Sequence, residues 1–287
     1  MGMSRLVRGQ ASGRARRVGL AASVGTLGLG GPGLFGPVVT HAAASAGQLG
    51  LHPNHVAARP GGSTSAGVGW ASTNWSGYAV TGSTYRAITG HWRVPSVSST
   101  SSATYSAAWT GIDGFNNSSL IQTGTEQDYY NGAVHYAAWW TTSAQSFIEQ
   151  AISEPVSPGD PISSSISQSN PSTSSWTITL TDDSSTHGWT FTKTVTYSGP
   201  GTSAEWIMEA PTVGGRVATL AHYQSPTTVD PGTVNGVSPG LVSGNGGELV
   251  VRSKGHYVVV SIPSVPDSDA DGFNISYGSS APQPPGS

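Results

Sequence analysis

The stretch that decides the fold is "SAEWIMEAP", residues 203–211. On a β-strand, successive side chains point to opposite faces. The two faces of such a strand are Trp206, Met208 and Ala210, and Glu205, Ile207 and Glu209. Only 9% of the 287 residues are charged, so two carboxylates in one short apolar stretch call for an explanation. They lie either on a solvated outer face or in a catalytic cleft.

Strand-like runs follow one another along the chain and indicate an all-β protein. After residue 70 no window sustains a 3.6-residue apolar period, and Gly, Pro, Ser and Asn interrupt every apolar run. Many short strand-like runs with turn residues between them are typical of a sandwich or a barrel. The neighbouring runs "SWTITLTDD" (175–183) and "HGWTFTKTVTYSG" (187–199) predict a hairpin.

The composition of the two ends predicts the domain organisation. Residues 1–46 contain several Arg residues, a Gly-rich apolar stretch and then small residues, which is the order of a secretory signal peptide. The apolar stretch contains too many Gly and Pro residues for a good membrane-spanning helix. We expect a propeptide or linker at 47–70, the folded domain at 71–278 and a disordered Pro-rich tail at 279–287. The protein is then secreted, extracellular and free of the membrane after export.

Charge and cysteine content exclude several classes of partner and chemistry. Residues 1–70 hold six of the twelve Lys and Arg and none of the fifteen acids, so the remainder carries a net charge of −9. An acidic body without a basic cluster is not expected to bind nucleic acid. The absence of cysteine excludes disulfides and thiolate chemistry. A monomer is expected.

The motifs of common hydrolases are missing, which leaves carboxylates and amides as candidates. There is no GxSxG, no HExxH and no phosphate loop, and the His residues show no metal-ligand spacing, so we expect neither a metal nor a cofactor. Glu126 and Asp128 border a turn, which favours exposure to water. Gln122 and Glu205 have apolar neighbours on both sides, which makes exposure to water a weaker explanation for them.

Five fragments in order give a resemblance to a known family. They are "NWSGY" (74–78), "WTGIDG" (109–114), "LIQTG" (120–124), "YAAWW" (136–140) and "AEWIMEAP" (204–211). Together they resemble the eqolisins, the glutamic peptidases, and the form NWSGY is similar to that of bacterial members.

This resemblance implies a fold and a site. The fold is a sandwich of two antiparallel sheets, similar to concanavalin A, with peptide or protein substrates bound on its concave face. The catalytic Gln and Glu of the family fall on Gln122 and Glu205. Residues expected to bind substrate are Trp75, Trp109, Asp113, Tyr136 and Trp139. Thr141 stands where the family commonly has an acidic residue, which puts the substrate preference in question.

The chemistry of the two catalytic candidates agrees with hydrolysis of peptides in acid. A Glu can take a proton from water and return it to the leaving amine, and its ordinary pKa near 4.3 suits acid conditions. A Gln amide can donate a hydrogen bond to the developing oxyanion, and pH does not change its charge. Glu209 is a candidate for a supporting role.

Two other classes of function fit parts of the pattern. A β-sandwich glycoside hydrolase could pair Glu205 with Asp113 or Glu126, but the Glu-x-Asp-x-x-Glu motif of such enzymes is missing. A carbohydrate-binding module would use exposed Trp residues, but it leaves the motif around Gln122 unexplained.

One further acidic stretch is a candidate metal site. "PDSDADGF" (266–273) begins like a calcium loop with Asp267, Asp269 and Asp271, but Gly278 stands at the position that requires Glu. A solvated acidic turn is therefore favoured over calcium binding.

Overall fold

The computed structural model describes residues 50–58, 64, 65 and 67–287. The predicted signal peptide lies outside the described residues, and so does part of the predicted propeptide. Within the described part of the chain, no helix is long and apolar enough to cross a membrane.

The described chain consists of short strands and three single-turn 3-10 helices. The strands are β1 (Trp70–Ser72), β2 (Trp75–Thr81), β3 (Ala87–Arg93), β4 (Ala107–Ile112), β5 (Ile121–Tyr130), β6 (Ala133–Thr142), β7 (Gln150–Ile152), β8 (Pro161–Asn170), β9 (Ser175–Asp182), β10 (Trp189–Thr196), β11 (Ser203–Glu209), β12 (Thr212–Val213), β13 (Arg216–Val217), β14 (Thr227–Val229), β15 (Thr233–Val234), β16 (Gly246–Ser253), β17 (His256–Pro263) and β18 (Phe273–Tyr277). The 3-10 helices are η1 (Ser143–Gln145), η2 (Pro171–Thr173) and η3 (Ser243–Asn245).

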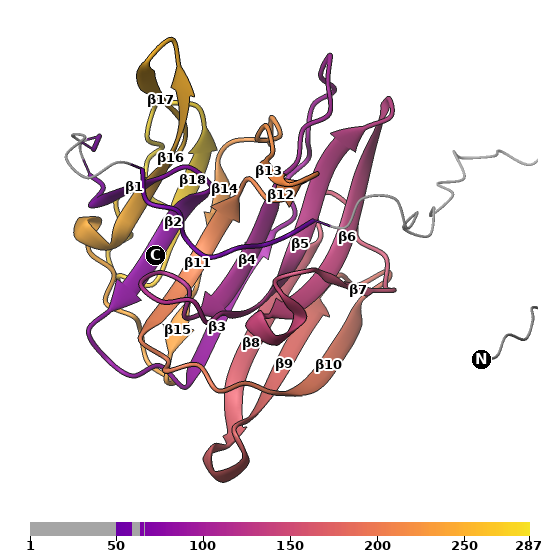
Figure 1. Cartoon of the computed structure of the whole chain (residues 1–287), viewed down its shortest axis with the longest axis vertical. Helices are drawn as coiled ribbons and strands as arrows, with labels where there is room; N and C mark the ends of the chain where they lie inside the picture. The colour runs from indigo at the N-terminus through magenta and orange to yellow at the C-terminus, as the bar shows by residue number, and fades with distance from the viewer. Residues whose placement is uncertain (1–49, 59–63, 66) are drawn as a thin grey trace, which may run out of the picture. The chain divides into compact units, whose positions relative to one another are not determined.

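The strands form a sandwich, as predicted. One layer runs β16–β2–β11–β4–β5–β6–β7, and the path continues through β17, β18, β14, β3, β8, β9 and β10 in the other layer (Figure 1). These neighbours pair in antiparallel fashion; β1 pairs with β16 in parallel. The predicted hairpin of β9 and β10 is confirmed by their register, in which Trp189 lies opposite Asp182.

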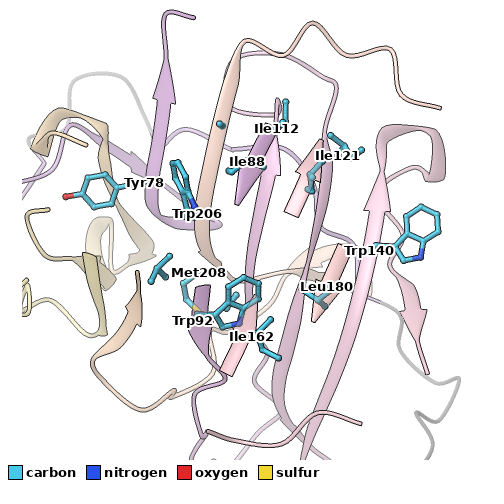
Figure 2. Close-up of a cluster of buried hydrophobic side chains, with 14 of the residues drawn as sticks. Tyr78, Ile88, Trp92, Ile112, Ile121, Trp140, Ile162, Leu180, Trp206 and Met208 are labelled. Carbon is cyan, nitrogen blue, oxygen red and sulfur yellow. The ribbon is translucent and has the colours of Figure 1, made fainter. Parts of the chain in front are cut away.

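The main core fills the space between the layers (Figure 2). Trp206 and Met208 lie in this core, so one face of β11 is apolar and buried, as its alternation predicts. The Trp206 indole N–H donates to the carbonyl of Thr89 on β3, which ties the two layers together. Gly90 permits this close approach, because a Cβ there would lie 2.5 Å from Thr110 Cγ2 and 2.8 Å from Trp206 Cδ1.

A second apolar cluster lies on the opposite face of β2, β11, β4, β5 and β6. We call this the Trp-rich face; its buried members are Trp75, Ala107, Trp109, Leu120, Trp139 and Ile207. Glu205 and Glu209 alternate with the core residues of β11 and therefore point to this face. The Trp-rich face is consequently where the catalytic candidates must be sought.

The parts of the chain that flank the predicted domain also have defined positions. Residues 50–58, inside the predicted propeptide, pack on the Trp-rich face through backbone hydrogen bonds. The residues that follow Tyr277 form no strand, and the Asn274 side-chain amide donates to the carbonyl of Gln283 in this tail at 2.9 Å.

Candidate active site

The sheet register places Gln122 and Glu205 in one row on the Trp-rich face. Gln122 lies opposite Gly111 of β4, and Gly111 lies opposite Glu205 of β11. Directly opposed residues of antiparallel strands point to the same face. Two strand spacings separate their backbones by about 10 Å. Their side chains can therefore approach one peptide bond from its two sides.

Gly111 keeps the middle of this row free of a side chain. A Cβ at this position would lie 2.8 Å from Trp109 Cζ3, 3.1 Å from the carbonyl oxygen of Ile121 and 3.2 Å from Leu120 Cδ1. Contacts this short force the neighbours to move. Steric crowding at the site thus explains why Gly111 of "WTGIDG" is a glycine.

Glu205 is fully buried, and its surroundings favour the neutral carboxyl. Among the described residues, neither of its oxygens has a hydrogen-bond partner of good geometry. Burial raises the pKa of Glu205 well above its ordinary value, the nearby Ser203 hydroxyl opposes this shift, and the charge of Asp113 adds to it. In this structure the carboxyl of Glu205 therefore holds its proton in acid.

Asp113, predicted to bind substrate, is buried within a network of hydrogen bonds. Its Oδ2 accepts from the Tyr197 hydroxyl at 2.7 Å and from the Gly201 backbone N–H at 2.8 Å. Its Oδ1 accepts from the Thr202 backbone N–H and the Asn117 side-chain amide, each at 2.8 Å. In the structure, Asp113 therefore holds the loop before β11 beside Glu205.

Gln122 is also fully buried, and it binds a peptide carbonyl. Its Nε2 donates to the backbone oxygen of His52 at 2.7 Å. Its Oε1 has no hydrogen-bond partner among the described residues. The side-chain amide of Gln122 thus donates a hydrogen bond to a peptide carbonyl oxygen, which is the kind of contact that stabilises an oxyanion.

His52 belongs to a segment, residues 50–58, that runs in extended form over the Trp-rich face. In Figure 1 this indigo segment crosses β11, β4 and β5. Backbone hydrogen bonds hold this segment in place. They join Leu51 to Thr212, His52 to Phe147, His55 to Gly114 and Val56 to Thr73. Peptides that bind proteins by adding to a sheet use the same backbone contacts.

The side chain of His52 enters a cluster of three buried carboxylates. Its ring stacks on Trp139 with centroids 3.7 Å apart and an interplanar angle of 0°. Its Nδ1 lies 3.0 Å from Glu209 Oε2, and its Nε2 lies 3.3 Å from Glu126 Oε1 and 3.5 Å from Glu149 Oε2. We call Glu126, Glu149 and Glu209 the carboxylate cluster.

The electrostatics of the cluster favour a charged imidazole. Burial opposes the charge on His52, but the three carboxylates outweigh it and raise the pKa of the imidazole well above its ordinary value. Burial, together with the neighbouring charge of Glu149, raises the pKa of Glu126 to about 7. Burial raises the pKa of Glu209 too, while His52 opposes that shift.

The expectation that Glu126 and Asp128 face water is wrong. They are only 8% and 5% exposed. β5 continues past them to Tyr130, and Gly50 lies over Glu126, where a Cβ of Gly50 would be 2.8 Å from Glu126 Oε1. Asp128 Oδ1 accepts a hydrogen bond from the Ser106 backbone N–H. Both residues therefore lie within β5, and the turn follows Tyr130.

The structure brings most of the predicted aromatic residues together. The rings of Trp75 and Trp109 are in edge contact, with centroids 4.8 Å apart, and Trp109 Nε1 donates to Glu209 Oε2 at 2.9 Å. Trp139 stacks on His52. Tyr136 alternates with Trp139 along β6 and packs against the main core on the opposite face, where its hydroxyl accepts from the Val97 N–H. The structure therefore separates Tyr136 from the other predicted residues.

His52 and Glu149 belong to this candidate site in the structure, and sequence reasoning missed both. His52 lies in a stretch that reads as a leader or linker, and Glu149 lies in a short irregular connection before β7. The available signal was weak: a His-Pro pair in a segment poor in charge. The other two carboxylates around His52, Glu126 and Glu209, come from β5 and β11. They lie more than seventy residues away from His52 in the sequence, so no local spacing reveals the cluster.

Two groups among the described residues outside this site have donor sets for a divalent cation: Asp160, Asp182 and His187, and a second group made of carboxylates alone. Asp230, Asp267 and Asp271 each offer a carboxylate oxygen, and these oxygens lie within 4.8 Å of one another. Asp267 is 8% exposed, so the description of this stretch as a solvated turn is wrong for that residue. Its Oδ1 accepts from the backbone N–H groups of Asp271 and Gly272. Oxygen-only ligands of this kind suit calcium or magnesium.

Comparison with known proteins identifies the family. The Peptidase A4 family matches residues 73–261. Aspergillopepsin-2 of Aspergillus niger is 31% identical over 192 residues, which are 58% of this chain and 66% of that protein. The chain thus matches slightly less than two thirds of the length of this curated relative.

Two crystal structures of scytalido-glutamic peptidase share the fold. The structure with a transition state analog inhibitor gives a TM-score of 0.56 at 25% identity, over 71% of this chain and 98% of that one. The structure with a peptide based analog gives a TM-score of 0.51 at 24% identity, with the same coverage. The chain belongs to the Peptidase A4 family of glutamic endopeptidases, the eqolisins.

Proposed function

We propose that the protein is a secreted endopeptidase that works in acid with Gln122 and Glu205 as its catalytic pair. The observation that carries this proposal is the row Gln122–Gly111–Glu205, in which the amide of Gln122 already binds a peptide carbonyl. Membership in the Peptidase A4 family supports it.

In the proposed mechanism, Glu205 handles the proton and Gln122 handles the charge on oxygen. Glu205 takes a proton from a water molecule while the water oxygen bonds to the carbonyl carbon. The carbonyl oxygen becomes an oxyanion, and the amide of Gln122 donates to it. The C–N bond then breaks, and Glu205 gives its proton to the leaving nitrogen.

This order of steps requires Glu205 to be ionised before water attacks. With the 50–58 segment in place, burial raises the pKa of Glu205, and its protonated carboxyl cannot act as a base. We infer that the working enzyme has water beside Glu205, because solvation of the charged form lowers the pKa of a carboxyl. The structure with the segment bound is accordingly interpreted as a resting form.

The 50–58 segment supports the proposal of a propeptide. It occupies the Trp-rich face, where a substrate must bind, and it uses the amide of Gln122 for its own backbone. We propose that the precursor is inactive until residues up to about 70 are removed. N-terminal sequencing of the active secreted protein tests this. A fully active protein that begins at Gly47 would contradict it.

The proposed activity is tested with two substrates and a chelator. The purified protein is expected to hydrolyse casein and not a polysaccharide in acid, and to keep its activity when a chelator is added. Hydrolysis of the polysaccharide alone would favour a glycoside hydrolase. Loss of casein hydrolysis with the chelator would contradict a mechanism based on Gln and Glu.

A further inference from the structure

The carboxylate cluster has the properties of a binding pocket and not only of a buried ion pair. Glu209 is fully buried, and its Oε1 has no hydrogen-bond partner among the described residues. Trp139 provides a flat face that holds a planar cationic ring, since cations and aromatic faces attract. Three carboxylates and one aromatic face are therefore directed at a single side chain.

The side chain of His52 occupies this pocket, and the backbone of His52 is held as the backbone of a bound substrate would be. The carbonyl of His52 accepts from Gln122, while the N–H of His52 donates to the carbonyl of Phe147 at 3.0 Å. If Gln122 stabilises the oxyanion, the residue whose carbonyl it binds is the residue on the N-terminal side of the bond to be cut. His52 therefore stands for that residue of a substrate.

We propose that Glu126, Glu149, Glu209 and Trp139 form a subsite for a positively charged side chain, imidazolium or ammonium, on the residue that donates the carbonyl of the cleaved bond. The inference rests on the proposed role of Gln122 and extends it from the reaction to the class of substrate. A carboxylate side chain is repelled by the same pocket, and an apolar side chain leaves the three carboxylates without a cationic partner.

The bond after His52 is one that the proposed site would cut poorly. Pro53 follows the bound carbonyl, and its ring nitrogen carries no hydrogen and is bulkier than an ordinary amide nitrogen. The segment thus combines the side chain that the pocket accepts with a bond that is poorly suited to hydrolysis. It serves as an internal example of the ligand class.

The test uses a series of short peptides that differ at one position X, where X is His, Lys, norleucine or Glu. Norleucine matches the stem of Lys without its charge. The secreted protein is assayed in acid, and mass spectrometry locates the cut. We expect kcat/KM to be about tenfold or more higher for His and Lys than for norleucine, with cleavage directly after X, and to be lowest for Glu.

Variants assign the preference to the pocket. Glu149→Gln keeps the shape of the side chain and removes its carboxylate, so it should lower the ratio of kcat/KM for Lys over norleucine towards one. Glu154→Gln is the matched control, because Glu154 is exposed, lies outside the cluster and should leave the ratio unchanged. Circular dichroism confirms that each variant is folded.

The possible outcomes separate this inference from the proposed function. Cleavage of the series without a preference for His and Lys would overturn the subsite and leave the peptidase mechanism standing. An unchanged ratio in the Glu149→Gln variant would do the same. Failure to hydrolyse casein or any peptide would contradict the proposed function itself.

Discussion

Gln122 and Glu205 point to the same side of the sheet from β5 and β11, and the only residue between them in their row is Gly111. An amide and a carboxyl thus face each other across a backbone that carries no side chain. In the proposed mechanism, this relationship separates two tasks that aspartic proteases give to a pair of carboxylates sharing one proton. Substitutions at the two positions can therefore test the two tasks independently.

Glu205→Gln should abolish turnover and leave the fold intact. The replacement is nearly isosteric, but an amide cannot accept a proton from water. The measurement is the turnover of a peptide in acid, with circular dichroism to confirm folding. Glu154→Gln serves as a control for loss of one exposed carboxylate. Near-normal turnover in a folded Glu205→Gln protein would remove Glu205 from the mechanism.

Gln122→Ala should lower kcat by about 10²–10³, the cost of losing one oxyanion donor in known cases. Gln122→Glu should be at least as slow. It places a second carboxylate near Glu205, which raises the pKa of one of the two and puts negative charge where the oxyanion forms. A Gln122→Glu protein as active as the parent would show that the oxygen of Gln122, and not its N–H, carries the function.

Gly111→Ala should reduce both activity and stability. The new Cβ would lie 2.8 Å from Trp109 Cζ3, and Trp109 donates the hydrogen bond that positions Glu209. The matched control is Gly244→Ala, where a Cβ meets nothing within 4 Å. Thermal unfolding and kcat/KM are measured for both. Equal effects of the two substitutions would show that the space at Gly111 is not needed.

The fold and parts of the site could be predicted from the sequence for physical reasons. The alternation in "SAEWIMEAP" separates Trp206 and Met208 from Glu205 and Glu209, and the structure confirms it. The proximity of Gln122 and Glu205 could not be predicted from this alternation. It depends on the strand order β5–β4–β11, which brings together residues more than eighty positions apart, so only the resemblance to a family could supply it.

The carboxylate cluster could not be predicted, because its partner came from outside the expected domain. Glu126 next to a turn looks solvated as long as nothing covers it. Residues 50–52 cover it in the structure, and their sequence has no strand period or charge that indicates such a role. Segments that bind through backbone hydrogen bonds leave little trace in side-chain patterns.

The titration of Glu205 should depend on the 50–58 segment. Burial raises the pKa of Glu205 in the structure with the segment bound, and a base must be ionised to act. We expect the ascending limb of kcat/KM against pH for the processed protein to lie at lower pH than the titration of Glu205 in the intact chain. The latter is followed by NMR of labelled Glu carboxyls. Identical values would contradict the interpretation of a resting form.

Docking of the 50–58 segment should weaken as the pH rises. The pKa of His52 is raised by docking, so the contribution of its charge is fully present below about pH 6.5 and is lost as the pH passes the raised value. The groups that face it are Glu126 from β5, Glu149 from the connection before β7 and Glu209 from β11, with Asp128 further along β5. The raised pKa values of Glu126, Asp128 and Glu209 act in the same direction, because ionising these buried carboxyls also costs stability.

Hydrogen exchange of the backbone amides of residues 51–56 measures this docking in the intact chain. Protection should be greater in mild acid than at alkaline pH, after correction for the intrinsic pH dependence of exchange. His52→Gln removes the titrating group and should flatten the dependence. Protection that increases with pH in the parent chain would show that the charge on His52 does not hold the segment in place.

The two-sided character of β11 has a consequence for the evolution of this protein. A shift of one residue in the pairing of this strand would exchange Trp206 with Glu205, sending a carboxyl into the main core and an indole to the Trp-rich face. A shifted register of β11 therefore cannot give a protein that is stably folded but inactive. Selection for a well-folded molecule and selection for a reactive one act on the same seven residues, and an insertion or deletion within Ser203–Glu209 should forfeit both at once.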